Sequence, residues 1–194
     1  MRTLRDRAEP FPPGPPVYVS LGVFDGVHVG HTRMLEELVR WSRERGGRPV
    51  VLTFEVHPRA VLHASPPTFI TSLDHRLRLF EKIGVEVCGV LSFDREFAAM
   101  TAEAFVREVL CGWAGARGVL LGHDQRFGRG GSGDLALLRK LASELDLDVR
   151  AMDAVRVRGR IVSSTAIRRA ILDGDLRAAA EMLGRPVSIL GTVV

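Results

Sequence analysis

Apolar runs alternate with amphipathic stretches along nearly the whole chain, and this alternation limits the fold more than any other feature. The apolar runs, which indicate strands, cover residues 17–21, 49–54, 85–91, 118–121 and 147–155. The stretches with helical spacing of apolar residues cover 32–45, 73–83, 101–110, 134–145, 163–172 and 175–183. Continuously apolar strands that alternate with helices predict an α/β fold, a parallel sheet with helices on both faces. Ligands of such sheets bind beyond the carboxyl ends of the strands.

Length and composition suit one globular domain. The chain has 194 residues, of which 46% are hydrophobic, which is enough to bury a core. The sequence contains no apolar run approaching the roughly 20 residues that a membrane span needs, and no apolar signal core follows the basic start at Arg2 and Arg5. We therefore expect a cytoplasmic protein with no membrane partner. Residues 1–16, rich in arginine and proline, are predicted to be an irregular lead-in.

The charged residues argue against a nucleic-acid-binding protein, and the cysteines argue against a metal-binding one. The formal net charge is +4, and nearly all the positive charge is arginine, scattered without a long basic run or aromatic interleaving. This distribution disfavours a nucleic-acid partner and favours solvated helix faces together with arginines that bind small-molecule phosphates. Cys88 and Cys111 lie in apolar stretches outside any CxxC pair, so we expect buried free thiols and no metal site.

The most informative motif lies between the first strand and the first helix. It reads Gly22-Val23-Phe24-Asp25-Gly26-Val27-His28-Val29-Gly30-His31. Glycines let the backbone turn sharply and approach a ligand, and the spacing of His28 and His31 lets both face one side of a helix entrance. Because helix N-termini attract anions, the motif indicates phosphate binding. The alternatives are incidental histidines in a glycine-rich turn, or a metal site, for which no Cys or His cluster lies nearby.

Two polar segments follow later strands. Segment 53–59 carries His57 and Pro58 and is either a ligand-binding wall or a polar loop with a proline turn. Segment 122–134 is rich in glycine and carries the three side chains Asp124, Arg126 and Phe127. The two charged side chains suit hydroxyl and phosphate groups, and the ring suits a flat ligand. A mobile surface loop is the alternative interpretation of this segment.

The fourth motif opens a helix. Ser163, Ser164 and Thr165 precede an apolar-periodic run that carries Arg168. Hydroxyl side chains at this position are ordinary helix caps. Together with the free backbone N–H groups and the arginine, they also suit a triphosphate. Both interpretations carry about equal weight when the motif is taken alone.

The order of these segments resembles that of a known family. Gly22 to His31 is similar to the signature of the HxGH nucleotidyltransferase superfamily, and its Phe-Asp-Gly-x-His form resembles the adenylyltransferase half of the prokaryotic bifunctional riboflavin kinase/FAD synthetases. Segment 162–168 is similar to that family's Ile-Ser-Ser-Thr-x-Ile-Arg stretch. The resemblance spans roughly residues 17–194 and implies a Rossmann-like parallel sheet with helices on both faces.

The resemblance implies an FMN adenylyltransferase, in which the phosphate of FMN attacks the α-phosphorus of ATP in line to give FAD and pyrophosphate. The residues it implies for catalysis are His28, His31, Ser164, Thr165 and Arg168. Those it implies for ligand binding are Gly22, Phe24, Asp25, Gly26, Gly30, His57, Pro58, Asp124, Arg126, Phe127 and Ser163. Mg²⁺ is expected to accompany ATP and to keep several waters, so no protein ligands are assigned to a metal.

The chain departs from the family pattern at three positions. Val56 stands where the family has a proline, Gln125 replaces a phenylalanine, and Gly131 stands where a basic residue is often found. We therefore keep two alternatives. One is an HxGH enzyme with a different phosphorylated acceptor, such as phosphopantetheine, or with a cytidylyl donor. The other is a flavin- or nucleotide-binding module without turnover.

The expected domain organisation also follows from the resemblance. Residues 17–185 correspond to the adenylyltransferase domain, and residues 186–194 resemble the start of a riboflavin kinase domain. The rest of that kinase domain is missing from the sequence, so its activity is not carried over. Whether a kinase domain is attached in a longer parent protein, and the oligomeric state, are left open by the sequence.

Overall fold

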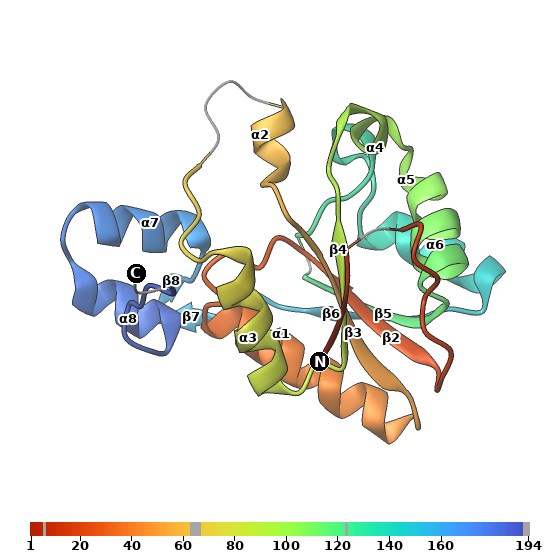
Figure 1. Cartoon of the computed structure of the whole chain (residues 1–194), viewed down its shortest axis with the longest axis horizontal. Helices are drawn as coiled ribbons and strands as arrows, with labels where there is room; N and C mark the ends of the chain where they lie inside the picture. The colour runs from red at the N-terminus through yellow and green to blue at the C-terminus, as the bar shows by residue number, and fades with distance from the viewer. Residues whose placement is uncertain (6, 63–66, 123, 192–194) are drawn as a thin grey trace.

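The computed structural model describes residues 1–5, 7–62, 67–122 and 124–191. Within these residues, the centre of the molecule is a six-stranded sheet in the order β1-β4-β3-β2-β5-β6 (Figure 1). All neighbouring strands pair in parallel. The strands are β1 (Arg2–Leu4), β2 (Val17–Leu21), β3 (Arg48–Phe54), β4 (Val87–Leu91), β5 (Ala116–Gly122) and β6 (Asp148–Met152). The predicted α/β, Rossmann-like fold class is confirmed.

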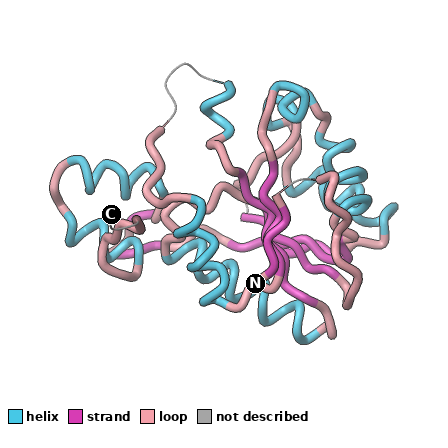
Figure 2. The backbone as a smooth tube through the Cα atoms, viewed as in Figure 1, coloured by secondary structure: helices cyan, strands magenta, loops and turns pink. Residues whose placement is uncertain are grey.

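From β2 onward, helices connect successive strands of the sheet (Figure 2). They are α1 (Val29–Glu44), α2 (Pro58–Leu62), α3 (Leu73–Ile83), α4 (Arg95–Ala99), α5 (Ala102–Ala104), the π-helix η1 (Phe105–Trp113), the 3₁₀ turn η2 (Arg129–Gly131) and α6 (Leu135–Leu145). After the sheet come the antiparallel pair β7 (Arg156–Val157) and β8 (Arg160–Ile161), then α7 (Ser164–Leu172) and α8 (Leu176–Leu183). In the described part of the chain, none of the helices is both long enough and apolar enough to cross a bilayer.

Helices cover both faces of the sheet because successive side chains of a strand point to opposite faces. Tyr18 of β2 packs with α1 and α3, whereas Val17, Val19 and Leu21 pack on the other face with η1 and α6. Among these helices, α3 carries the usual caps at both ends. It begins after Ser72, whose hydroxyl accepts a hydrogen bond from the His75 N–H, and ends at a glycine in the left-handed conformation.

The last two helices form a small unit beside the sheet (Figure 1, left). Its apolar cluster is separate from the two clusters on the faces of the sheet, and its buried members are Val162, Ile167, Ala179 and Leu183. This unit lies next to the place where the strand order reverses. From β2 the chain runs outward to β3 and β4, and then returns to β5 beside β2. Ligand sites of open α/β sheets lie at such a switch point, outside the carboxyl ends of the strands.

Several elements differ from the sequence-based expectations. The interpretation of residues 1–16 as irregular is wrong for Arg2–Leu4, which form β1 and pair in parallel with β4. Leu4 is fully buried, so the pairing is decided by tertiary contacts, which three residues of sequence cannot reveal. The helix expected over 101–110 is capped by Thr101 but continues as a π-helix to Trp113. The sequence did not reveal α2, α4 or the β7–β8 pair.

Candidate functional site

A cavity of about 640 Å³ opens at the carboxyl ends of β2 and β5. It is lined by residues from all four segments that the sequence singled out. The predicted site residues in its lining are Gly22, Phe24, Asp25, His28, Gly30, His31, His57, Pro58, Asp124, Arg126, Phe127, Ser163, Ser164, Thr165 and Arg168. Gly26 is not part of the lining, and its N–H donates to Thr71 Oγ1 at 2.9 Å. The structure thus brings all but one of the predicted residues around one cavity.

The turn before α1 has an unusual backbone. Phe24, Gly26 and Val27 have φ angles of 52°, 80° and 40°. Residues other than glycine rarely adopt positive φ angles. His28 then caps α1, because its Nδ1 accepts a hydrogen bond from the His31 N–H at 3.3 Å. The acceptor role of Nδ1 assigns the proton of the neutral imidazole to Nε2. The turn therefore presents an N–H donor at the helix entrance.

The two imidazoles form a stacked, uncharged pair. Their ring centroids lie 3.6 Å apart, with 15° between the ring planes. Burial lowers the pKa of His28 to about 4, although the neighbouring Asp25 carboxylate raises it in part. Burial, and secondly the neighbouring His28, lower the pKa of His31 well below its ordinary value. Both rings are therefore neutral near pH 7, so the stack carries no like-charge repulsion and its N–H groups can still donate to an anion.

This pKa shift predicts a loss of stability in acid. An unfolded His28 protonates below about pH 6.5, whereas the folded one stays neutral down to about pH 4. The unfolded state therefore binds more protons in this window, and His28 should cost about 2 kcal/mol of the free energy of unfolding between pH 7 and pH 4.5. Urea unfolding at both pH values measures this loss. The His28→Asn variant keeps a cap acceptor but does not titrate, so it should lose correspondingly less. An equal loss in the two proteins would contradict the assignment.

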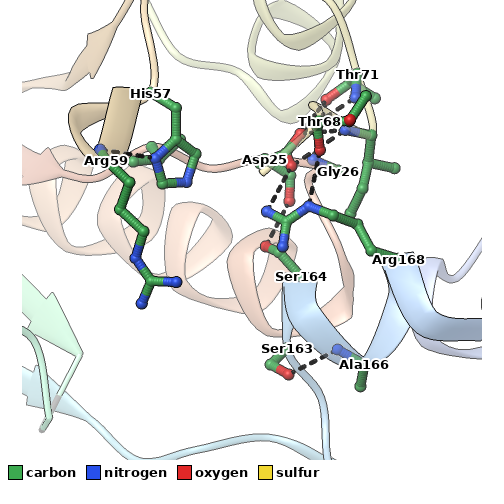
Figure 3. A network of polar contacts seen from close by, with 12 residues as sticks. Asp25, Gly26, His57, Arg59, Thr68, Thr71, Ser163, Ser164, Ala166 and Arg168 are labelled. Carbon is green, nitrogen blue, oxygen red and sulfur yellow. Dashed lines mark hydrogen bonds and ion pairs between the residues drawn. The ribbon is translucent and has the colours of Figure 1, made fainter. Parts of the chain in front are cut away.

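Asp25 is the centre of a polar network beneath the turn (Figure 3). Its side chain is 2% exposed and accepts hydrogen bonds from the backbone N–H groups of Ile70, at 2.9 Å, and Thr71, at 3.1 Å. It also forms an ion pair at 3.1 Å with Nη2 of Arg168. A buried carboxylate is tolerated because each of these donors compensates its lost hydration.

The same network joins the turn to the N-terminus of α7. Ser164 Oγ donates to the backbone carbonyl of Asp25 at 2.9 Å, and Arg168 Nε donates to the Thr68 carbonyl at 2.8 Å. Ser163 caps α7 by accepting from the Ala166 N–H at 3.2 Å. The N-termini of α1 and α7 are thus held at one cavity, and both direct partial positive charge toward it.

A second wall of the cavity comes from the segment after β3. His57 Nδ1 accepts a hydrogen bond from the Arg59 N–H at 3.2 Å, and Figure 3 shows both side chains across from Asp25 and Arg168. Burial, and secondly the charge of Arg168, lower the pKa of His57. Val56 is 45% exposed and is not part of the cavity lining. Two of the three departures from the family pattern, Gln125 and Gly131, do line the cavity.

The glycine-rich segment after β5 is docked on the fold. Phe127 and Gly133 exchange backbone hydrogen bonds of 3.1 and 2.8 Å, and the Phe127 ring lies 5.7 Å from that of Phe105. Gln125 joins the ends of two strands, since its Nε2 donates to the Leu21 carbonyl at 2.6 Å and its Oε1 accepts from the Gly122 N–H. His123, part of the same motif, lies outside the described residues.

This docking yields a stability prediction with a matched control. Gly128 and Gly130 both have positive φ angles, but Gly128, with φ 72° and ψ −179°, lies in a region open essentially to glycine alone, whereas Gly130, with φ 62° and ψ 13°, is left-handed helical. In addition, only a Cβ at Gly128 would collide with the backbone of Ala102, at 2.6 Å. A Cβ at Gly130 meets nothing within 4 Å. Gly128→Ala should therefore destabilise the protein by about 1 to 3 kcal/mol more than Gly130→Ala. Thermal and urea unfolding of both variants measure the difference, and equal stabilities would argue against the docked segment.

Sequence reasoning missed two groups of residues at the site. The first is an aromatic wall formed by Phe54, Phe93, Phe97 and Phe105, whose apolar side chains are indistinguishable from core residues in the sequence. The second group consists of arginines that support the site from a distance. One of them is Arg76, which is fully buried. Its guanidinium donates to the Val23 carbonyl at 2.7 Å and to the Phe54 carbonyl at 3.0 Å. This arginine holds the ends of β2 and β3 together, although its position on α3 gave no signal for that role.

The sheet order and the two helix entrances at its switch point place the chain in the nucleotidyltransferase class of Rossmann-like folds. The model of the FAD synthetase family matches residues 13–166, and the chain belongs to that family. It is 36% identical over 177 residues to a bifunctional riboflavin kinase/FMN adenylyltransferase from Escherichia coli K12, covering 91% of this chain and 56% of the relative. A putative bifunctional enzyme from Geobacillus thermodenitrificans is 36% identical, over 88% of this chain and 90% of the relative.

Solved structures share the fold. A Streptococcus pneumoniae structure described as a macrolide-efflux protein superposes with a TM-score of 0.85 at 30% identity, covering 96% of this chain and 63% of the other. A pantothenate synthetase from Thermus thermophilus has a TM-score of 0.53 at 17% identity, covering 95% and 82%, which is a likeness of fold alone. The chain spans slightly more than half the length of the bifunctional E. coli relative.

Proposed function

We propose that this chain transfers the adenylyl group of ATP to FMN, which forms FAD and releases pyrophosphate. The observation that carries the proposal is the pair of helix entrances at one cavity. One bears the stacked His28 and His31, and the other bears the hydroxyls of residues 163–165 together with Arg168. Family membership supports the same reaction.

The reaction needs positioning and charge stabilisation more than covalent help from the protein. The phosphate of FMN attacks the α-phosphorus of ATP, and the bond to the pyrophosphate oxygen breaks on the opposite side. His28 and His31 donate hydrogen bonds to the triphosphate as negative charge moves to the leaving group. Thr165 and Arg168 hold the pyrophosphate from α7 with their side chains, and Ser164, whose hydroxyl donates to the Asp25 carbonyl, contributes its backbone N–H at the start of the helix. Arg168 uses Nε and Nη2 for Thr68 and Asp25, and a guanidinium has further N–H donors for phosphate.

The flavin would occupy the aromatic side of the cavity. Phe54, Phe93, Phe97 and Phe127 offer apolar surface for a flat ring system. His57, Pro58, Asp124 and Arg126 line the same cavity, and the polar side chains among them would contribute polar contacts to the flavin. Arg126 also pairs with Asp134 at 3.1 Å, so it has to share its donors if it contacts the FMN phosphate.

Mg²⁺ enters this proposal as the partner of ATP. Bound with ATP, Mg²⁺ would neutralise part of the phosphate charge and would keep several of its waters. Among the described residues, no group of three or more His, Cys, Asp or Glu side chains is placed to hold a metal. Asp25, which lies nearest the histidine pair in sequence, is engaged by Arg168. The described residues therefore do not form a metal cage, and the ion would be held chiefly by the phosphates of ATP.

The test is an assay of the protein with FMN and Mg-ATP, in which FAD is read by chromatography and pyrophosphate release is followed in parallel. The proposal predicts FAD and pyrophosphate in equal amounts. A panel with phosphopantetheine as acceptor and CTP as donor, read by product mass, distinguishes the other HxGH chemistries. Product from another acceptor but not from FMN would reject the flavin assignment. FMN binding without pyrophosphate release would indicate a binding module and reject catalysis.

We extend the proposal to the setting of the enzyme. Its substrates are the small molecules ATP and FMN, and we infer that it acts in the cytoplasm, where both are available. The name and length of the E. coli relative, of which this chain covers 56%, support a riboflavin kinase domain joined to this one in a longer parent protein. The assignment of residues 17–185 to the adenylyltransferase domain and of 186–194 to the start of the kinase domain is part of the proposal, and 192–194 lie outside the described residues.

A further inference from the structure

Arg185 reaches from the end of α8 back to the histidine-bearing turn. Its Nη2 donates to the Gly26 carbonyl at 2.6 Å, and its Nη1 donates to the Val27 carbonyl at 2.9 Å. Burial is what lowers the pKa of its guanidinium. Arg185 lies beyond residues 13–166, the part matched by the family model, and 158 residues separate it in sequence from Val27.

Two neighbours of Arg185 contact the same region. Gly184 has a φ of 72° at the end of α8, and a Cβ there would lie 2.8 Å from Cγ1 of Val29, the first residue of α1. Leu183 is 4% exposed, and its Cδ2 lies 3.4 Å from the place where a Cβ on Gly26 would stand. Three successive residues, 183–185, therefore pack against the turn and the start of α1.

The two carbonyls held by Arg185 are those on which the position of His28 depends. Val27 has a φ of 40°, which costs a β-branched residue conformational energy and needs support from its surroundings. The Val27 carbonyl belongs to the peptide that links it to His28. Fixing this peptide fixes the backbone of His28, whose Nδ1 in turn accepts from the His31 N–H. Arg185 thus braces the strained turn from outside α1 itself.

We propose that Arg185 is a positioning residue, which acts through the Gly26 and Val27 carbonyls to hold the His28 imidazole in place for the phosphates of ATP. This inference rests on the proposed adenylyl transfer for its kinetic consequences, but its structural part is independent of that reaction. It gives the α7–α8 unit a second role beyond supplying Ser164 and Arg168. The unit also sets the geometry of the helix entrance that faces it.

The experiment compares Arg185→Met, which removes charge and donors, with Arg177→Met as the matched control. Arg177 lies on α8 with its side chain 85% exposed. In Arg185→Met, kcat for FAD formation should fall by roughly 10- to 100-fold, because small displacements of a catalytic group are costly, while the KM for FMN stays close to that of the parent protein. Arg177→Met should match the parent in both.

A second readout needs no substrate. Imidazole ¹⁵N NMR of the free protein reports the tautomer and the titration of His28, which faces Asp25 and the stacked His31 as well as Arg185. The ¹⁵N signal of His28 should move in Arg185→Met and stay unchanged in Arg177→Met. The pKa of His28 should rise in Arg185→Met through the loss of charge alone, because the charge of Arg185 lowers it. Displacement of the ring is therefore read from the His28 signal in Arg185→Lys, which keeps the charge. If the parent protein makes no FAD, the proposed function fails, and the NMR measurement alone decides the role of Arg185.

The result that overturns the proposal is a folded Arg185→Met protein with parental kcat and parental His28 signals. Should that variant not fold, Arg185→Lys takes its place. A lysine keeps the charge but presents its donors from a single nitrogen, so it should restore the fold and leave a smaller loss of kcat and a displaced His28 signal. Parental kinetics together with parental His28 signals in Arg185→Lys would equally overturn the proposal.

Discussion

Replacing His28 and His31 together with alanine is expected to lower kcat for FAD formation by roughly 1,000-fold or more, because loss of a single preorganised donor to a developing charge already costs about 100- to 1,000-fold. The affinity for FMN should change little, because in our proposal the flavin packs on the aromatic wall and the histidines contact the triphosphate of ATP. The two imidazoles are neutral, stacked donors at a helix entrance, and alanine offers no N–H to the triphosphate. Steady-state kinetics and a flavin fluorescence titration measure the two quantities.

A control separates the chemistry from the capping role of His28. The ring accepts the His31 N–H as the cap of α1, so alanine also weakens the helix. His28→Asn preserves a cap acceptor and should restore stability without restoring turnover, because the amide cannot reach where Nε2 lies. Near-parental turnover in the double alanine variant would remove both histidines from the mechanism.

Asp25→Ala is expected to destabilise the protein by about 3 to 5 kcal/mol, the usual cost of removing one partner of a buried ion pair. The substitution would leave the Arg168 guanidinium without its carboxylate, and the N–H groups of Ile70 and Thr71 without an acceptor. Turnover should fall as well, because the link between the turn and α7 is weakened. Urea unfolding at pH 7 gives the free energy of unfolding.

The matched control is an exposed ion pair at the end of α7. Asp173 pairs with Arg169 at 2.7 Å, but their side chains are 49% and 77% exposed. Asp173→Ala should therefore cost less than about 1 kcal/mol. Asp25→Asn keeps one acceptor oxygen and should fall between the two alanine variants. If Asp25→Ala cost no more than Asp173→Ala, the network would not be the link between the two helix entrances.

The fold was predictable where the spacing of apolar residues within one segment indicates a strand or a helix. β3 is buried along its whole length, so its apolar run indicated a sheet covered on both sides, and α3 and α8 both end at glycines. α1 begins at Val29, earlier than its apolar spacing indicates, because an imidazole serves as its cap. The π-helical geometry of η1 depends on packing that its sequence does not display.

The site was predictable where polar residues cluster in the sequence. Glycines, histidines and hydroxyls within short segments indicated most of the polar lining of the cavity, but neither its aromatic wall nor the distant supports of the turn. Arg76 and Arg185 were missed because each is a single arginine on or after a helix, and the carbonyls that they hold at the turn and at the end of β3 lie 22 or more residues away in sequence. Only the folded chain shows that these guanidiniums hold the backbone of the turn.

The account depends most on a single triphosphate lying between α1 and α7. A crystal structure of the protein with a non-hydrolysable ATP analogue and Mg²⁺ tests this directly. We expect the phosphates between the imidazoles of residues 28 and 31 and the N-terminus of α7, with the α-phosphorus open to the aromatic side of the cavity. A nucleotide bound elsewhere, or one that contacts only one of the two helix entrances, would contradict the account.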